Sequence, residues 1–119
     1  MFTVKVESSF SSAHNLKGYK GKCEELHGHN WSVELAVSKS TLDKIGMALD
    51  FSYLKGKLHE VLEILDHKYL NDVPYFKKIN PTSENIAKYI YDTLKPRISN
   101  ISSITVWESD NSSATYHGE

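Results

Sequence analysis

The chain has 119 residues, with 14 Lys plus Arg against 15 Asp plus Glu, a formal net charge of -1 and 39% hydrophobic residues. This length predicts a single domain over residues 1–119 that can bury a core of ordinary size. The near balance of charge excludes a global field that would hold nucleic acid or an anionic membrane, so we expect neither as a partner.

Cysteine content and hydropathy indicate a reducing compartment. The single Cys cannot form an internal disulfide, and no apolar stretch approaches the roughly 18 residues that a membrane span needs. The N-terminus alternates apolar and polar residues from Phe2 to Glu7 and lacks the apolar run of a signal peptide. We therefore expect a cytoplasmic protein.

The same alternation predicts a first strand with one covered face. Residues 15–25 contain two Gly, three Lys and few aliphatic side chains, which predicts a loop longer than a hairpin needs. Loops of that length are often functional. Alternation returns from His27 to Ser38, and we expect this second strand to pair antiparallel with the first.

The rest of the chain predicts two helices and two more strands. Residues 54–65 carry an apolar stripe of helical period after Asp50 or Ser52 as the N-cap, and a second helix follows Thr82 and ends before Pro96. Residues 101–108 and 114–116 alternate around a turn at residues 110–112. The order ββααββ predicts an α+β fold in which both helices cover one face of a four-stranded antiparallel sheet.

Three histidines are placed to share a metal ion. His27 and His29 are two residues apart at the start of a strand, so their side chains point to the same face. Antiparallel pairing brings His14, near the end of the preceding strand, beside them. Three neutral imidazoles leave one tetrahedral position open, which is the arrangement of a catalytic zinc.

Two other interpretations of this cluster stay open. A His-X-His pair alone is equally often two partly exposed polar residues. Cys23 could be a fourth ligand that closes a structural site, although such sites more often use two or more Cys. The third histidine and the nearby Cys favour a metal centre.

Cys23 is also a candidate catalytic group. It lies in the predicted loop shortly before His27, where a nearby metal and Lys20 or Lys22 would lower the pKa of the thiol and favour the thiolate. A thiolate near neutral pH is a competent base or nucleophile. The alternative is a spare loop thiol without a function.

Asp66, His67 and Glu108 are further candidates. A carboxylate that accepts from one imidazole nitrogen fixes the tautomer and raises the basicity of the other nitrogen, although His67 could equally be a helix C-terminal residue favoured by the dipole. Glu108 ends the third long strand, where it is either solvated or able to hold two adjacent N–H groups of a ligand. His59 is expected at the surface, and His117 has no evident partner.

Several segments together resemble one enzyme family. They are Ser12 Ala13 His14, the run Cys23 Glu24 Glu25 Leu26 His27 Gly28 His29, Leu65 Asp66 His67 with Leu70 Asn71, Asn80 Pro81 Thr82 Ser83 Glu84, and Glu108. The chain is similar in these segments, and in their order, to the 6-pyruvoyl-tetrahydropterin synthase family. The three-residue spacer between Cys23 and His27 resembles the 6-carboxytetrahydropterin synthase branch.

The resemblance implies a tunnelling fold, in which sheets join edge to edge into a trimeric barrel and two trimers stack as a homohexamer. It implies zinc ligands at His14, His27 and His29, a base at Cys23 and a pterin-anchoring carboxylate at Glu108. It also implies that Asp66 and His67 form a partner pair, which can come from a different subunit than the Cys.

The implied reaction converts 7,8-dihydroneopterin triphosphate to 6-carboxytetrahydropterin with loss of acetaldehyde and triphosphate, an early step toward the deazaguanine bases of tRNA such as queuosine. Glu24 and Glu25 leave open the aldolase of some relatives, which gives 6-hydroxymethyl-dihydropterin, and 6-pyruvoyl-tetrahydropterin synthesis is a further alternative. A zinc hydrolase and a non-catalytic, zinc-stabilised binding module also stay open. From local charge alone, Lys17, Lys20 and Lys22 are candidates for contacting the triphosphate.

Overall fold

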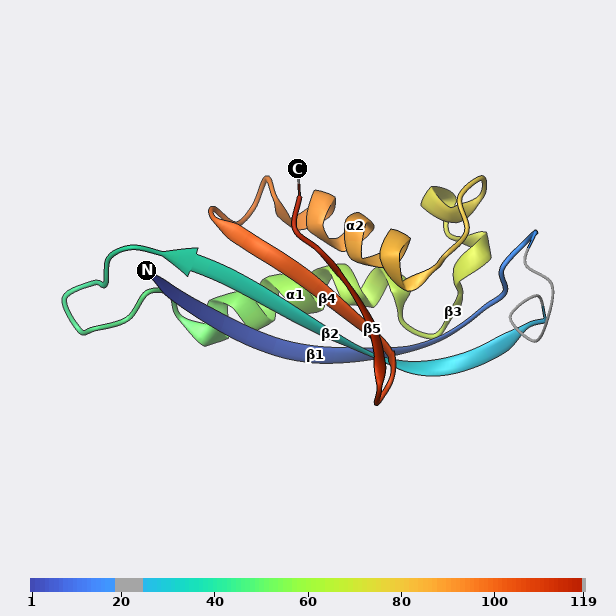
Figure 1. Cartoon of the computed structure of the whole chain (residues 1–119), viewed down its shortest axis with the longest axis horizontal. Coiled ribbons are helices and arrows are strands. Elements are labelled where there is room, and N and C mark those ends of the chain that lie inside the picture. Colours follow the sequence, from blue (N-terminus) through green and yellow to red (C-terminus); the bar gives the residue numbers. More distant parts are fainter. Residues whose placement is uncertain (19–24, 119) are drawn as a thin grey trace.

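The computed structural model describes residues 1–18 and 25–118. Its elements are, in chain order, β1 (Phe2–His14), β2 (His27–Lys39), α1 (Phe51–Leu65), β3 (Lys68–Tyr69), α2 (Ser83–Leu94), β4 (Ile101–Ser109) and β5 (Ser112–Tyr116). Two short 3-10 helices, Leu70–Asp72 and Pro74–Phe76, lie between β3 and α2. Figure 1 shows β1 and β2 as a long curved ribbon, with both helices on one face of the sheet.

The sheet has five strands in the order β3-β1-β2-β4-β5, and its long strands are antiparallel as the alternation predicts. The prediction of a four-stranded, wholly antiparallel sheet is wrong in one respect, because β3 adds a short strand parallel to β1. The chain turns at His67, which has a positive φ of 54°, and the His67 N–H then donates to the Ser11 carbonyl at 2.6 Å. Two polar residues paired this way give no periodic signal in the sequence.

The core lies between the helices and one face of the sheet. On β1 the buried positions include Val6 and Phe10, and on β2 they run from Trp31 through every second residue to Val37. Because side chains alternate along a strand, these residues share one face, and their register partners face them directly. The helices meet this face with buried side chains from α1 and α2, which are Leu54, Leu58, Val61, Leu62, Leu65, Ile86, Ala87, Ile90 and Leu94.

Capping side chains mark the start of α1 and of α2, and a proline follows the end of α2. Asp50, not Ser52, is the N-cap of α1, and its side chain accepts a hydrogen bond from the Ser52 N–H at 2.8 Å. Thr82 caps α2 as predicted by accepting from the Asn85 N–H at 3.1 Å, and α2 ends before Pro96. Among the helices of the described residues, none combines the length and the hydropathy that crossing a membrane requires.

Helix α1 offers a matched test of this core. Leu58 is fully buried, whereas Ile64 on the same helix is 45% exposed. We expect Leu58→Ala to lower the free energy of unfolding by about 2–5 kcal/mol, because it leaves a cavity, and Ile64→Ala to lower it by less than about 1 kcal/mol. Urea titration followed by circular dichroism measures both. Equal losses in the two variants would contradict the burial described here.

Candidate metal centre and active site

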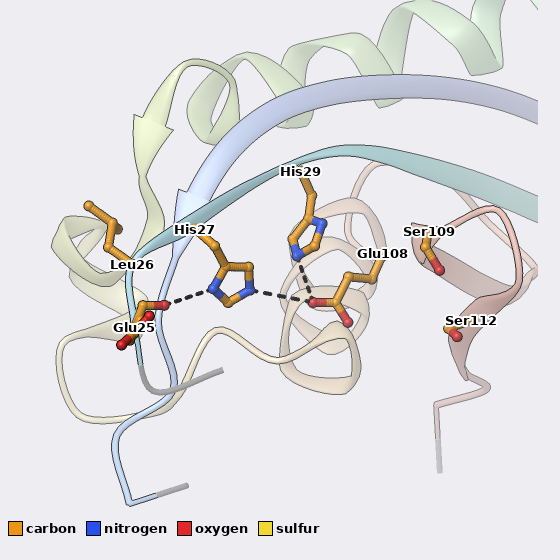
Figure 2. Close-up of a pocket in the computed structure, with 7 residues that line it drawn as sticks. All are labelled: Glu25, Leu26, His27, His29, Glu108, Ser109 and Ser112. Atoms are coloured by element: carbon orange, nitrogen blue, oxygen red, sulfur yellow. Dashed lines mark hydrogen bonds and ion pairs between the residues drawn. The ribbon is translucent and has the colours of Figure 1, made fainter. Parts of the chain in front are cut away.

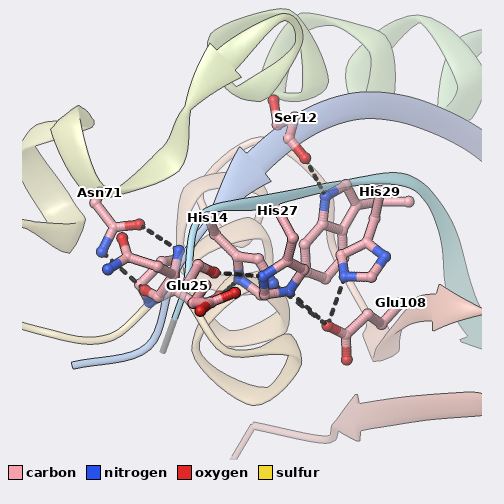
Figure 3. Close-up of polar contacts among 10 residues, drawn as sticks. Ser12, His14, Glu25, His27, His29, Asn71 and Glu108 are labelled. Carbon is pink, nitrogen blue, oxygen red and sulfur yellow. Dashed lines mark hydrogen bonds and ion pairs between the residues drawn. The ribbon is translucent and has the colours of Figure 1, made fainter. Parts of the chain in front are cut away.

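The register of β1 with β2 brings the three predicted histidines together. His14 pairs with His27, and Ser12 pairs with His29, so all three imidazoles lie on the helix-facing side of the sheet. Their ring centroids are 4.5 to 5.4 Å apart. Figure 3 shows the three rings side by side at the end of the two long strands. The structure therefore brings the three predicted histidines into one cluster.

Hydrogen bonds to carbonyl groups set the tautomers of two of these rings. His14 Nδ1 lies 2.7 Å from the Pro81 carbonyl oxygen, and His27 Nδ1 lies 2.8 Å from the Glu25 carbonyl oxygen. A carbonyl oxygen only accepts, so in each ring Nδ1 carries the hydrogen and Nε2 presents a lone pair. This outer-shell arrangement is typical of metal-ligating histidines.

Glu108 supplies a fourth donor atom to the cluster. Its Oε1 lies 2.9 Å from His29 Nε2, 3.3 Å from His14 Nε2 and 3.9 Å from His27 Nε2. The register between β4 and β5 shifts between Trp107 and Ser109, so Glu108 is at a β-bulge, a feature that often re-aims a side chain next to an active site. The sequence suggested a carboxylate at the strand end but not its place among the histidines.

The four donors fit a divalent metal ion. One ligand atom from each residue lies within 4.8 Å of the others. Nε2 of His14 and Nε2 of His29 are buried, and neither makes a hydrogen bond to any described residue, although both face the Glu108 carboxylate. Buried nitrogens without a hydrogen bond are costly unless something else binds them. Imidazole and carboxylate together suit zinc and related transition metals.

The surroundings keep His14 neutral. Its side chain is only 2% exposed, and its ring stands edge-on to Trp31 at a centroid distance of 4.8 Å. Burial lowers the pKa of His14 below its usual value, and the charges on His27 and His29 lower it further, against the opposing effects of the Pro81 carbonyl and Glu108. A neutral imidazole is the form that binds a metal.

A cavity of about 600 Å³ opens beside this cluster. Its lining residues are Glu25, Leu26, His27, His29, Glu108, Ser109 and Ser112. Figure 2 shows His27 and His29 directed at Glu108, and the two serines lie at the end of β4 and the start of β5. The volume is in the range of small-molecule sites, and the sequence analysis missed both serines because single serines beside a turn carry no distinctive motif.

Asp66 and His67 form the predicted pair. His67 Nδ1 lies 2.9 Å from Asp66 Oδ2, and Asp66 Oδ1 accepts from the Ser11 N–H at 2.8 Å. The Ser11 N–H and, after it, His67 hold the pKa of Asp66 below its usual value. The pair directly precedes β3 at the edge of the sheet with His67 82% exposed, and the described residues do not bring it into the histidine cluster.

Two asparagines brace the chain just after His14. Asn71 accepts from the Asn15 N–H at 3.1 Å and donates to the Asn15 carbonyl at 2.9 Å. Asn80 does the same for Lys17, at 2.9 and 2.8 Å. Because Asn80 precedes Pro81, whose carbonyl holds His14, this bracing ties the end of β1 to the start of α2. Sequence reasoning noted both asparagines only as parts of motifs.

Several predicted residues lie outside the described residues, namely Cys23, Lys20, Lys22 and Glu24. Lys17, which is among the described residues, is exposed. His59 is at the surface as predicted, 2.9 Å from Glu63, and His117 is exposed.

The pKa of His14 predicts a pH dependence of stability. The unfolded residue titrates near 6.5, whereas folding lowers its pKa, so below about pH 6.5 the unfolded chain binds a proton that the folded protein disfavours. Metal-free protein should therefore lose stability between pH 7.5 and pH 5.5 in urea titrations with a chelator. Asp66 does not contribute in this range, because its stabilising effect is lost only below about pH 3.8.

The control for this effect is His59, which is exposed on α1. His14→Gln should flatten the dependence of unfolding free energy on pH, and His59→Gln should leave its slope unchanged. An undiminished slope in His14→Gln would show that another group carries the effect.

The bracing by Asn80 predicts a local change in hydrogen exchange. Asn80→Ala removes the acceptor of the Lys17 N–H, and a hydrogen bond worth about 1 kcal/mol corresponds to a rise of about fivefold in exchange at that amide. The Asn15 amide, which Asn71 holds, is the internal control. Equal acceleration at both amides would indicate general loosening and contradict the specific bracing.

Comparison with known proteins places this site in a family. Residues 3–119 match the family described as 6-pyruvoyl tetrahydropterin synthase. A 6-carboxy-5,6,7,8-tetrahydropterin synthase of Synechocystis is 38% identical, with 98% of this chain and 93% of the relative covered. A 6-pyruvoyl tetrahydrobiopterin synthase of Dictyostelium discoideum is 37% identical, with 92% and 91% covered.

Structural comparison finds the same family as the sequence comparison. The solved structure of Caenorhabditis elegans 6-pyruvoyl tetrahydropterin synthase matches with a TM-score of 0.89 at 33% identity, covering 99% of this chain and 96% of that one. The family match over nearly the whole chain, together with relatives above 30% identity, confirms the resemblance drawn from the residues. The chain belongs to the 6-pyruvoyl tetrahydropterin synthase family.

Proposed function

We propose that this protein is a zinc-dependent lyase that converts 7,8-dihydroneopterin triphosphate and water to 6-carboxy-5,6,7,8-tetrahydropterin, acetaldehyde and triphosphate. The observation that carries the proposal is the convergence of three imidazole nitrogens and one carboxylate at the wall of a cavity of about 600 Å³. A cavity of this size suits a pterin with its side chain.

The chemistry needs no nicotinamide or flavin. The pterin ring gains two hydrogens while the side-chain carbon attached to it is oxidised to a carboxylate, so the redox change is internal to the substrate. When bound by His14, His27 and His29, zinc would supply Lewis acidity that eases removal of a proton from carbon. The protein must then move protons at defined positions.

Two groups are proposed for these proton transfers. Asp66 holds the Nδ1 hydrogen of His67, which leaves His67 Nε2 to take or give a proton. Cys23, as a thiolate, would remove the first proton from the substrate. Glu108 would hold the N–H edge of the pterin through a two-oxygen contact.

The oligomer implied by the resemblance completes this scheme. His67 lies exposed at the β1 edge, away from its own chain's histidine cluster, which supports a site shared between subunits. Strand β5 is an edge strand, and within the described residues β1 pairs with β3 at only two positions, so both edges offer free backbone groups. We therefore propose a homohexamer of two barrel-shaped trimers, located in the cytoplasm and acting in a queuosine-type pathway.

A second reaction has one observation in its favour. Glu25 lines the cavity beside His27, where a carboxylate could act as the base of an aldolase that gives 6-hydroxymethyl-dihydropterin. The two relatives reported above also differ in the product that their names carry. Product identity therefore has to be tested directly.

Mass spectrometry of the product makes that test. Incubation of the zinc-loaded protein with 7,8-dihydroneopterin triphosphate should yield 6-carboxytetrahydropterin and acetaldehyde. Cys23→Ala should lower the rate by about 10²- to 10⁴-fold, as expected for a lost general base. Hydroxymethyl-dihydropterin as the only product, abolished by Glu25→Gln, would refute the proposal in favour of the aldolase.

Metal removal separates the remaining classes of protein. Zinc-stripped protein should lose activity and keep its circular dichroism spectrum, because the hydrophobic core is made of apolar side chains and includes none of the three histidines. Unfolding on removal would favour a zinc-stabilised binding module. Full activity of Cys23→Ala toward other hydrolysable substrates would favour a zinc hydrolase.

A further inference from the structure

Glu108 has two possible roles, holding the pterin and binding a metal ion with the histidines, and one carboxylate cannot fill both at the same time. The proposed function needs its two oxygens at the N–H edge of a pterin, whereas the structure places Oε1 among the Nε2 atoms of the three histidines. Figure 2 shows the side chain leaning toward His27 and His29 from the end of β4.

The distances are those of a fourth ligand. In a tetrahedral zinc site with bonds of about 2.0–2.1 Å, neighbouring ligand atoms are about 3.3 Å apart. Oε1 lies 2.9, 3.3 and 3.9 Å from the three nitrogens, which brackets that value. Since two of those nitrogens are buried without a hydrogen bond, the oxygen is placed to complete a coordination sphere.

The Glu108 side chain is also positioned so that it can move away from the three histidines. Its side chain is 32% exposed and forms part of the cavity wall, so a ligand in the cavity can reach its oxygens. The bulge between Trp107 and Ser109 leaves this residue outside the regular β4–β5 ladder. By contrast, hydrogen bonds to backbone carbonyls hold the rings of His14 and His27 in place.

We propose that Glu108 is a displaceable fourth ligand. In the absence of substrate its carboxylate closes the metal centre, and the N–H edge of an arriving pterin draws it away, which opens a coordination position when the substrate is in the cavity. This inference rests on the proposed function, because it takes the pterin as the ligand. It makes opening of the metal centre dependent on recognition of the ring.

Cobalt binding to the metal-free protein tests whether Glu108 is a metal ligand in the absence of substrate. Glu108→Gln and Glu108→Ala should weaken Co²⁺ binding by at least about tenfold and alter the visible Co²⁺ spectrum, with circular dichroism unchanged. Glu34→Gln is the matched control, because Glu34 is on the same sheet with a similar 25% exposure but contacts Lys5. Unchanged affinity and spectrum in both Glu108 variants would overturn the proposal.

Unsubstituted pterin tests whether the ring displaces Glu108 from the metal, because it has the N–H edge but lacks the side-chain hydroxyls of the substrate. Its addition to the Co²⁺-loaded protein should shift the spectrum toward that of Glu108→Gln and should cause no such shift in that variant. Pterin fluorescence reports binding separately. Binding of pterin without a spectral change, or the same spectral change in Glu108→Gln, would overturn the proposal that pterin displaces Glu108.

These outcomes separate the displacement of Glu108 by pterin from the proposed reaction. If the exchange occurs but no carboxytetrahydropterin forms from the triphosphate, the proposed reaction is wrong and the displaceable ligand stands. If pterin does not bind at all, both the exchange and the proposed substrate class are overturned.

Discussion

The pairing register of β1 with β2 is the constraint on which the site depends. His14 opposite His27 and Ser12 opposite His29 put three imidazoles on one face, and a slip of one residue would turn one strand's donors to the other face. The same register sets Phe10 opposite Trp31 and Val6 opposite Leu35. The hydrophobic core therefore enforces the alignment that the metal donors need.

The candidate metal centre is a continuation of the core along the same face. Trp31 stacks on Phe10 on one side, and it meets His14 and His29 edge-on on the other, at centroid distances of 4.8 and 5.2 Å. An apolar wall excludes water from His14 and keeps this imidazole neutral, which is the state that binds a cation. Burial thus serves stability and ligand chemistry with the same side chains.

Sequence patterns predicted the parts of this structure that are local. The period of two in β2, the caps of both helices and the His-X-His spacing each follow from neighbouring residues. The parallel strand β3, the bracing by Asn71 and Asn80 and the position of Glu108 did not follow, because each depends on which distant segments pair. Glu108 shares the alternation of Ile104 and Val106, but only the β2–β4 register and the bulge after Trp107 decide what it faces.

The structure divides the proposed chemistry between fixed and accessible groups. Metal donors need positions held to fractions of an ångström, and the candidate donors His14 and His27 are at the paired ends of β1 and β2, where the carbonyls of Pro81 and Glu25 hold their ring nitrogens. The groups proposed to exchange protons need contact with substrate, and His67 is exposed at the sheet edge, where Asp66 links it to the Ser11 N–H. Because the described part of one chain keeps these two sets apart, the proposed proton-transfer pair would reach a substrate at the histidines of another subunit, whose surface would face that edge of the sheet.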